Sequence, residues 1–394
     1  MDLLRLGLIG ASGTIATLHR GYFEKIEGLE LAAVCDVTEE LVAPVAEETG
    51  ARAWTDAEAM IRSGEIDAVL IACPHFEHPR YARVAFKAGV HALCEKPVAV
   101  TAEEAQETDR LYAEAQREHP NLLFAGMFNQ RTNPLWREVK RLIDDGSVGE
   151  LMRLSWTIST WFRTQAYYNS GGWRATWSGE GGGVLLNQCP HNLDLLCWFV
   201  GQPSRVIAKA ALGKQHDIEV EDEVSALLDF PNGATGTFFT STGEAPGVNR
   251  LEVVGTGGTI LCEGDKLTFL RVQTPVDAFR AESPGRFASP AVTRVEVTPP
   301  ALDGLEHEHV TRNFVEVALA GGTQADLVAP ATEGVLGLEL GNAMLLSGLS
   351  GSVPIELPMD RAAYAAKLRE LQAGSTYVKP EVEVGEADLS GSFG

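Results

Sequence analysis

The first 126 residues alternate short apolar runs with longer segments in which apolar residues recur at helical spacing. We predict strands at residues 6–10, 31–35, 68–73, 92–94 and 122–126. We predict helices at residues 16–25, 39–49, 56–63, 79–88, 102–118 and 133–145. Thr101 and Glu104 form a capping-box signal at the start of one of these helices. Strand–helix alternation is typical of a parallel, doubly wound sheet, so this part is predicted to be an α/β domain.

The pattern then changes to longer runs rich in valine, threonine and aromatic residues. We predict strands at residues 151–161, 205–212, 223–230, 234–242, 250–254, 259–262 and 266–272, with a hairpin turn at Pro231-Asn232-Gly233. Helices are predicted at residues 187–200, 306–320 and 332–349. Because no crossover helices separate most of these strands, we predict an α+β domain with a large, mostly antiparallel open sheet.

The two patterns give a predicted organisation of two domains and a tail. The first domain is expected to cover residues 1–126 and the second residues 127–376, followed by an acidic tail at 377–394. The two late helices are expected to pack either on the second sheet or back on the first domain. The tail is expected to be mobile or to form an arm that reaches a neighbouring subunit.

Composition narrows the possible partners and the compartment. The 394 residues carry a formal net charge of −22, which repels phosphate backbones and anionic lipid. Six separate cysteines without zinc spacing, and a start without a signal peptide, predict a cytoplasmic protein with buried thiols. His307-Glu308-His309 does not place both imidazoles on one helical face, so we interpret it as a solvated helix start and predict no metal site.

A glycine-containing turn follows the first predicted strand and opens a helix. Gly10, Ser12, Gly13, Thr14 and Ile15 lie where backbone N–H groups can approach a pyrophosphate at a helix N-terminus. The spacing is an imperfect version of the Rossmann dinucleotide-binding pattern, and a plain strand–helix turn is the alternative. Ser12 is expected either to crowd the phosphate or to donate its hydroxyl to it.

Other polar residues end neighbouring strands of the same predicted sheet. Asp36 ends the second strand, where a carboxylate can accept both ribose hydroxyls and repel a 2′-phosphate, which favours NAD over NADP. An exposed strand-end aspartate is the alternative. Cys73, Pro74 and His78 follow another strand, at the edge where ligands bind in such sheets, although His78 could equally cap a helix.

Two segments carry candidate catalytic groups. Glu95-Lys96-Pro97 follows a buried strand and supplies a cation at its carboxyl end. In the glycine-rich segment 181–194, Asn187, His191 and Asp194 are spaced to share one face of the predicted helix. A helix capped by Asn187 with His191 in the core is the alternative. Alcohol oxidation by a nicotinamide needs a base for the hydroxyl proton and a positive donor for the developing oxyanion, and His191 and Lys96 match these roles.

A loop rich in aromatic residues and arginine precedes the glycine-rich segment. It contains Arg163, Tyr167, Trp173 and Arg174 among further aromatic residues. Planar side chains beside hydrogen-bond donors are typical of sugar sites, and a dimer contact is the alternative. We predict substrate binding by Lys96, Asn129, Arg163, Tyr167, Trp173, Asn187 and His191. Cofactor binding is predicted for Gly10, Ser12, Gly13, Thr14, Ile15, Asp36, Cys73, Pro74, His78, Glu95, Lys96 and Arg174.

Together these motifs resemble the Gfo/Idh/MocA family of nicotinamide-dependent sugar and polyol oxidoreductases. The resemblance runs from the Gly10 turn through Glu95-Lys96-Pro97 and Trp173-Arg174 to the His191 segment. It implies that Lys96 is the catalytic lysine, that His191 is the acid/base and that the chain forms a homodimer or homotetramer through its open sheet. Members similar to inositol dehydrogenases carry aspartate at the position of Asn187, so Asp194 or the substrate is expected to compensate.

The expected activity is hydride transfer between NAD and a secondary hydroxyl of a sugar, glycoside or cyclic polyol. Two alternatives use the same fold. A redox-neutral NAD-dependent glycosidase would share Lys96 and His191 but give no net NADH. A sugar sensor could lose these two residues, and this chain keeps both.

Overall fold

The structure is a computed structural model that describes residues 3–379, and its contacts divide the chain into two units. Unit 1 comprises residues Met1–Thr132 and Leu302–Leu338. Unit 2 comprises Asn133–Ala301 and Glu339–Gly394. Residues 302–338 therefore group with the first unit, although they follow the strands of the second in sequence. The predicted tail lies outside the described residues except for residues 377–379.

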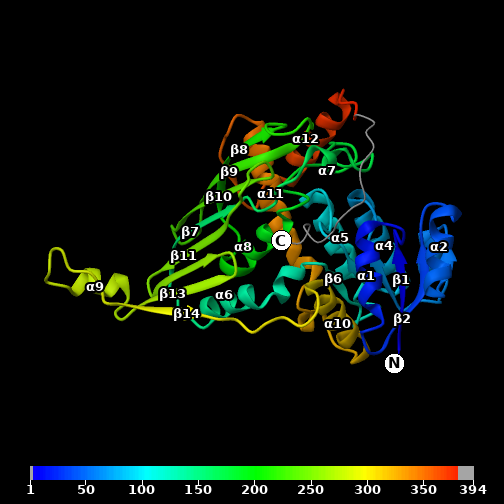
Figure 1. Ribbon diagram of the computed structural model, residues 1–394, viewed down its shortest axis with the longest axis horizontal. Coiled ribbons are helices and arrows are strands. Elements are labelled where there is room, and N and C mark those ends of the chain that lie inside the picture. Colours follow the sequence, from blue (N-terminus) through cyan, green and yellow to red (C-terminus); the bar gives the residue numbers. More distant parts are fainter. Residues whose placement is uncertain (1–2, 380–394) are drawn as a thin grey trace. The chain divides into compact units, whose positions relative to one another are not determined.

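Unit 1 is built on a six-stranded parallel sheet in the order β3-β2-β1-β4-β5-β6 (Figure 1). Its strands are β1 (Leu4–Ile9), β2 (Leu29–Cys35), β3 (Arg52–Trp54), β4 (Ala68–Ile71), β5 (His91–Cys94) and β6 (Phe124–Gly126). Its α-helices are α1 (Thr14–Phe23), α2 (Glu39–Thr49), α3 (Ala57–Arg62), α4 (His78–Ala88), α5 (Ala102–Ala115) and α10 (Glu306–Leu319). Short 3₁₀ turns lie at His75–Glu77, Asn129–Thr132, Gln324–Asp326 and Ala331–Glu333. This confirms the predicted doubly wound α/β fold.

The sheet of unit 1 is buried because its strands are almost continuously apolar. All four residues of β4 are buried, and five of the six residues of β1 are buried as well. Strands covered on both faces have this composition in α/β folds. The Thr101 hydroxyl accepts the Glu104 N–H at 3.2 Å, which confirms the predicted cap of α5. The late helices were expected to pack on the second sheet or back on the first domain. Helix α10 packs on the first domain, because it contacts α1, β1 and β5 in unit 1.

Unit 2 contains a nine-stranded sheet in the order β14-β13-β12-β11-β7-β10-β9-β8-β15. Its strands are β7 (Leu151–Ile158), β8 (Arg205–Leu212), β9 (Glu221–Asp229), β10 (Thr235–Ser241), β11 (Asn249–Gly255), β12 (Gly258–Glu263), β13 (Lys266–Val272), β14 (Val292–Val297) and β15 (Ile355–Glu356). Its helices are α6 (Pro134–Asp144), α7 (Gln165–Asn169), α8 (Pro190–Val200), α9 (Val276–Glu282) and α12 (Arg361–Gly374). β7 and β10 pair in parallel and the other neighbouring strands of this sheet pair antiparallel, which confirms the predicted, mostly antiparallel sheet.

One face of the unit 2 sheet is covered by helices. The rings of Trp136 on α6, Trp156 on β7 and Phe199 on α8 lie within 6.2 Å of one another between their centroids. Helix α11 (Gly334–Leu349) begins in unit 1 and continues in unit 2, where the Ser347 hydroxyl accepts the Ala208 N–H of β8 at 2.9 Å. On the opposite face, alternate side chains of β9 are exposed, including Leu227 at 59%.

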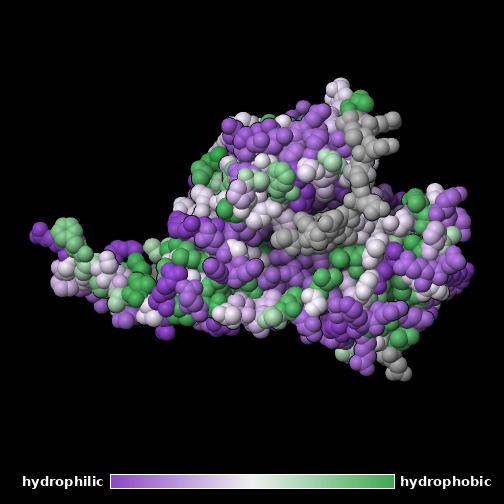
Figure 2. Space-filling model, viewed as in Figure 1, coloured by the Kyte–Doolittle hydropathy of each residue, from purple (hydrophilic) through white to green (hydrophobic). Residues whose placement is uncertain are grey.

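Several elements differ from the sequence-based prediction. The predicted helix at residues 187–200 begins only at Pro190, because proline fits the first turn of a helix, where its missing N–H has no intrahelical partner. Strands β3, β14 and β15 and helices α7, α9 and α12 were not predicted. Helix α9 extends away from the rest of unit 2, and the surface of this projection is partly apolar (Figures 1 and 2). Phe287, which lies between α9 and β14 in the sequence, is 98% exposed. Within residues 3–379, no helix combines the length and apolar composition that a membrane crossing requires.

Candidate functional site

The glycine turn of unit 1 has the geometry that an anion-binding loop needs. Gly10 has a φ of +77°, and a Cβ added there would lie 2.5 Å from the Ala72 carbonyl oxygen at the end of β4. Only glycine fits this close approach and this backbone conformation. Helix α1 begins at Thr14, and its N-cap Gly13 makes no side-chain cap hydrogen bond. The first N–H groups of α1 therefore have no intrahelical acceptor and fit a pyrophosphate.

Asp36 directly follows β2, and its carboxylate lies against this turn. Its Oδ2 accepts the Ser12 N–H at 2.9 Å and the Ser12 hydroxyl at 2.7 Å, while its Oδ1 accepts the Val37 N–H at 2.8 Å. The Ser12 hydroxyl is thus turned toward the carboxylate. These contacts bring the glycine turn and the end of β2 together, so the residues fit a dinucleotide with its diphosphate at α1 and its ribose near Asp36.

His78 connects two further candidate segments at the same edge of the sheet. Its Nε2 lies 2.7 Å from the Cys73 carbonyl oxygen and its Nδ1 lies 2.7 Å from the Pro97 carbonyl oxygen. Burial lowers the pKa of His78, although the two carbonyl contacts oppose that effect. The residue is only 1% exposed, so it holds the ends of β4 and β5 in place and does not face solvent as a simple helix cap would.

Lys96 follows β5, and a buried carboxylate fixes its backbone. Glu95 Oε2 accepts the Lys96 N–H at 3.1 Å, and Glu95 Oε1 lies 2.7 Å from His19 Nε2. Because a carboxylate can only accept, His19 donates this bond. Burial would raise the pKa of Glu95, but the His19 hydrogen bond and the charges of His19, His307 and Lys96 outweigh it and lower the pKa to about 2. Glu95 is therefore ionised beneath Lys96.

The hydrogen-bonded chain continues from His19 into α10. His19 Nδ1 contacts the Tyr22 hydroxyl, which lies 3.1 Å from Thr311 Oγ1, and the His307 ring stands edge-on to His19 at 5.8 Å. All of these side chains are at most 5% exposed. The interpretation of His307 and Glu308 as a solvated helix start is therefore wrong, because α10 packs this turn onto α1. Sequence reasoning missed His19, whose signal was a histidine on the apolar face of the helix after the glycine turn.

Asn129 completes the candidate residues of unit 1. Its side-chain amide donates to Glu306 Oε2 at 2.9 Å, and the residue is 4% exposed. Its Oδ1 is buried and has no hydrogen-bond partner among the described residues. A buried carbonyl oxygen without a hydrogen-bond donor costs free energy, so Asn129 Oδ1 is well placed to accept a hydrogen bond from a ligand.

In unit 2, the predicted arginines and aromatic residues gather around Tyr167. The Tyr167 hydroxyl accepts from Arg174 Nη1 at 2.6 Å and from Gln188 Nε2 at 3.0 Å. The Arg163 guanidinium lies 5.1 Å from the centre of the Tyr167 ring, and the Arg174 guanidinium lies 4.3 Å from it and 4.7 Å from the Trp173 ring. Arg174, which the sequence assigns to cofactor binding, thus lies among the substrate-binding candidates. The sequence analysis did not single out Gln188, which is buried and whose Oε1 has no hydrogen-bond partner within residues 3–379.

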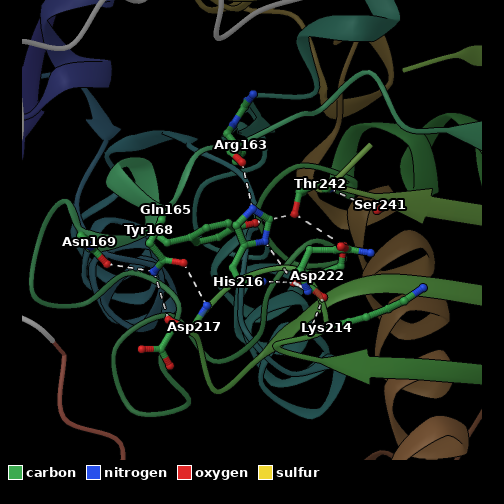
Figure 3. A network of polar contacts seen from close by, with 12 residues as sticks. Arg163, Gln165, Tyr168, Asn169, Lys214, His216, Asp217, Asp222, Ser241 and Thr242 are labelled. Carbon is green, nitrogen blue, oxygen red and sulfur yellow. Dashed lines mark hydrogen bonds and ion pairs between the residues drawn. The ribbon is translucent and has the colours of Figure 1, made fainter. Parts of the chain in front are cut away.

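A buried polar network anchors the segment that carries Arg163 and Tyr167 (Figure 3). His216 Nδ1 lies 3.0 Å from Asp222 Oδ2, and His216 Nε2 lies 2.9 Å from the Arg163 carbonyl oxygen. The Tyr168 hydroxyl lies 2.8 Å from Thr242 Oγ1. Burial would lower the pKa of His216, but its bonds to Asp222 and to the Arg163 carbonyl raise it above the ordinary value. The loop is therefore held on β9 and β10.

The glycine-rich segment differs from the predicted helix. Asn187 precedes α8 and lies in a turn in which its N–H donates to the Gly183 carbonyl at 2.9 Å. The prediction that Asn187, His191 and Asp194 share one helical face is therefore wrong for Asn187. His191 and Asp194 lie on α8 with 9% and 2% exposure. The Asn187 amide donates to Glu180, a buried carboxylate that the sequence analysis did not single out.

Comparisons with known proteins agree with both units. Residues 4–119 match the family described as "Oxidoreductase family, NAD-binding Rossmann fold", and residues 136–261 match the GFO/IDH/MocA C-terminal domain. Myo-inositol 2-dehydrogenase of Thermotoga maritima is 27% identical over 67% of this chain and 77% of its own length. Levoglucosan dehydrogenase of Pseudarthrobacter phenanthrenivorans is 27% identical over 69% of this chain and 76% of its own length.

A solved structure extends the similarity to nearly the whole chain. The WlbA dehydrogenase of Bordetella pertussis, solved with NADH and UDP-GlcNAcA, has a TM-score of 0.73 and 26% identity, covering 91% of this chain and all of that one. One family match lies in each unit, and the matched regions cover 77% and 76% of the two relatives. The chain therefore belongs to the Gfo/Idh/MocA family of oxidoreductases, and its first unit is the NAD-binding Rossmann domain of that family.

Proposed function

We propose that this NAD-dependent oxidoreductase transfers a hydride between the nicotinamide and a secondary hydroxyl of a sugar, glycoside or cyclic polyol. The observation that carries the proposal is Lys96, placed after β5 and fixed through its backbone by the ionised Glu95. Inositol, levoglucosan and glucoside dehydrogenases among the relatives support the substrate class. When NAD is bound, its nicotinamide would accept the hydride.

The proposed roles follow from the chemistry of each side chain. Lys96 holds the substrate oxygen while negative charge develops on it, because a positioned ammonium stabilises an oxyanion. His191 accepts the hydroxyl proton, because a neutral imidazole can act as a general base. Asn187 positions a hydroxyl. Arg163, Tyr167, Trp173, Arg174 and Asn129 are proposed to bind the substrate, because they present ring faces, donors and an unpartnered carbonyl oxygen.

Substrate screening tests the proposal directly. NADH formation should be measured with a panel of free sugars, glycosides and inositols, together with release of the aglycone from each glycoside. We expect net NADH with at least one member of the panel. Aglycone release without net NADH would instead support a redox-neutral glycosidase. Tight NAD binding without turnover of any member would contradict the dehydrogenase.

Cofactor preference provides a second test, based on Asp36. NADH is expected to bind more tightly than NADPH, because a 2′-phosphate would meet the Asp36 carboxylate. The Asp36→Ala variant should narrow the difference in Kd, since it removes both the ribose acceptor and the repulsion. Ser12→Ala is the matched control, because it removes one hydrogen bond to Asp36 and leaves the charge. Tighter binding of NADPH than NADH by the wild type, measured by fluorescence, would contradict this assignment.

The family resemblance also leads us to propose a homodimer or homotetramer in a cytoplasmic setting. The support from this chain is the uncovered face of the unit 2 sheet, where Leu227 is 59% exposed. Apolar side chains on an open sheet face are typical of subunit contacts. Light scattering in solution tests the assembly, and a monomer at micromolar concentration would contradict it.

A further inference from the structure

A buried carboxylate stands directly behind Asn187. Glu180 is 1% exposed, its Oε1 accepts the Asn187 amide, and its Oε2 accepts the Ala175 N–H at 2.6 Å. The Glu180 and Gly181 N–H groups both donate to the Thr176 carbonyl, at 2.9 and 3.0 Å, which fixes the backbone on either side of the Glu180 carbonyl. A charge buried this completely is retained only where donors compensate it.

The contact determines which way the Asn187 amide points. A carboxylate can only accept, so the NH₂ group of Asn187 must face Glu180. The Oδ1 atom therefore points away from Glu180. Asn187 thereby offers a hydrogen-bond acceptor to whatever it meets, a hydroxyl or an imidazole N–H.

The same carboxylate holds the segment that carries Trp173 and Arg174. Ala175 has a φ of +58°, a conformation that is uncommon for residues other than glycine. Its N–H is the group that donates to Glu180. Such a backbone persists only where its surroundings fix it. Glu180 therefore joins the end of the aromatic and arginine-rich loop to the turn that contains Asn187.

A second buried carboxylate fixes the other side of this turn. Glu221 is fully buried and accepts the Gly183 N–H at 2.9 Å and the Leu185 N–H at 3.0 Å. A Cβ added to Gly183 would lie 1.9 Å from the Glu221 carbonyl oxygen, so the turn packs against β9 without space for a side chain. Burial and the charge of Glu180 raise the pKa of Glu221 to about 7. The turn before α8 is thus rigid on both sides.

We propose that Glu180 is a positioning residue for the reaction, which acts through Asn187. This rests on the proposed function. Glu180 orients the Asn187 amide as an acceptor and ties it to the Trp173-Arg174 segment. The Glu180 carboxylate thus lies one hydrogen bond away from the Asn187 side chain.

If Glu180 and Asn187 act as a hydrogen-bonded pair, exchanging the carboxylate and the amide between them should lower kcat/KM less than the poorer single substitution does. Glu180→Gln presents an NH₂ group to one of two donors and should lower kcat/KM about 10- to 100-fold, with NADH binding unchanged. Asn187→Asp sets two carboxylates against each other, so one must take up a proton. In the combined Glu180→Gln/Asn187→Asp variant, the amide at 180 donates to the carboxylate at 187 and still accepts the Ala175 N–H. This double variant should recover at least about tenfold over the poorer single variant.

The pH profile separates positioning from mere stability. The swap moves the negative charge to position 187, so the acidic limb of kcat/KM should shift to higher pH than in the wild type, because a nearer anion raises the pKa of the base. Glu219→Gln is the matched control. Glu219 also accepts a backbone N–H of this region, from Trp177 at 2.7 Å, and it should leave the profile unchanged.

Thermal unfolding of the wild type, the Glu180→Gln and Asn187→Asp variants and the double variant gives a measurement that needs no substrate. Recovery of stability in the double variant over both single variants is expected and would establish the pairing. Recovery of stability without recovery of kcat/KM or a shifted limb would overturn the positioning role. A double variant that is no better than the singles in either measurement would overturn the pairing too. A wild type inactive on the whole panel would overturn the proposed function, while the stability cycle would still report the pairing.

Discussion

The Lys96→Ala variant is expected to lose about 10²- to 10⁴-fold in kcat while it binds NADH nearly as tightly as the wild type. The loss follows from the removal of the ammonium that holds the developing oxyanion. The fold should survive, because the contact that fixes this turn is made by the Lys96 backbone N–H to Glu95 and remains in the variant. The measurement is steady-state oxidation of the best substrate, with NADH binding followed by fluorescence.

A second lysine of unit 1 provides the control. Lys87 is exposed near the end of α4, so Lys87→Ala changes the net charge by the same amount without touching the end of β5. Its kcat should equal that of the wild type. An unchanged kcat in Lys96→Ala would remove Lys96 from the mechanism. An equal loss in both variants would point to the global charge and not to a positioned ammonium.

The fold could be predicted largely because its signals are local. Helix α2 and strand β13 have the predicted bounds, since apolar spacing and turn residues mark both ends. Strand β3 has three residues and no buried side chain, so it carries little pattern. Strand β14 is exposed at five of its six positions and gains its partner only through pairing with β13. Elements that depend on a neighbour for their stability are hard to recognise from sequence.

Some of the contacts in the candidate site join residues that the sequence analysis had identified, but their grouping was predicted less well. The contacts of Ser12 with Asp36, and of Arg174 with Tyr167, join residues that the sequence singled out. These residues could be recognised from the sequence because charged and aromatic residues next to glycine-containing turns are unusual. Their grouping was less accessible, since Arg174 lies with Tyr167 although it was assigned to the cofactor.

The missed residues are those that act on other protein groups. His19, Glu180 and Gln188 each lie next to a predicted residue and hydrogen-bond to another side chain. Nothing in their spacing indicates a partner, because the partner is 76 positions away for His19. The shift of the helix start from Asn187 to Pro190 has a similar origin, because Glu221 and Gly183 hold the preceding turn through tertiary contacts.

The second large effect concerns the support of Glu95, and His19→Phe tests it. The phenyl ring keeps the approximate shape of the imidazole but cannot donate to the buried carboxylate. Leaving a buried carboxylate charge without its partner typically costs about 3–5 kcal/mol. We therefore expect the free energy of unfolding in urea to fall by about 3 kcal/mol at neutral pH. His119→Phe is the control, because His119 is an exposed histidine of the same unit and should cost little.

The pH dependence of that loss identifies its cause. In the wild type the pKa of Glu95 is lowered to about 2, below the ordinary 4.5, so its contribution to stability is present above about pH 4.5. Without His19, burial dominates and the folded protein prefers a neutral Glu95. The unfolded chain is then the more easily ionised state, so the cost of His19→Phe should grow as pH rises above about 4.5, the ordinary pKa of a glutamate. Adding Glu95→Gln to His19→Phe removes the charge and should abolish this slope. A cost that is independent of pH would show that His19 contributes packing alone and that another group keeps Glu95 ionised beneath Lys96.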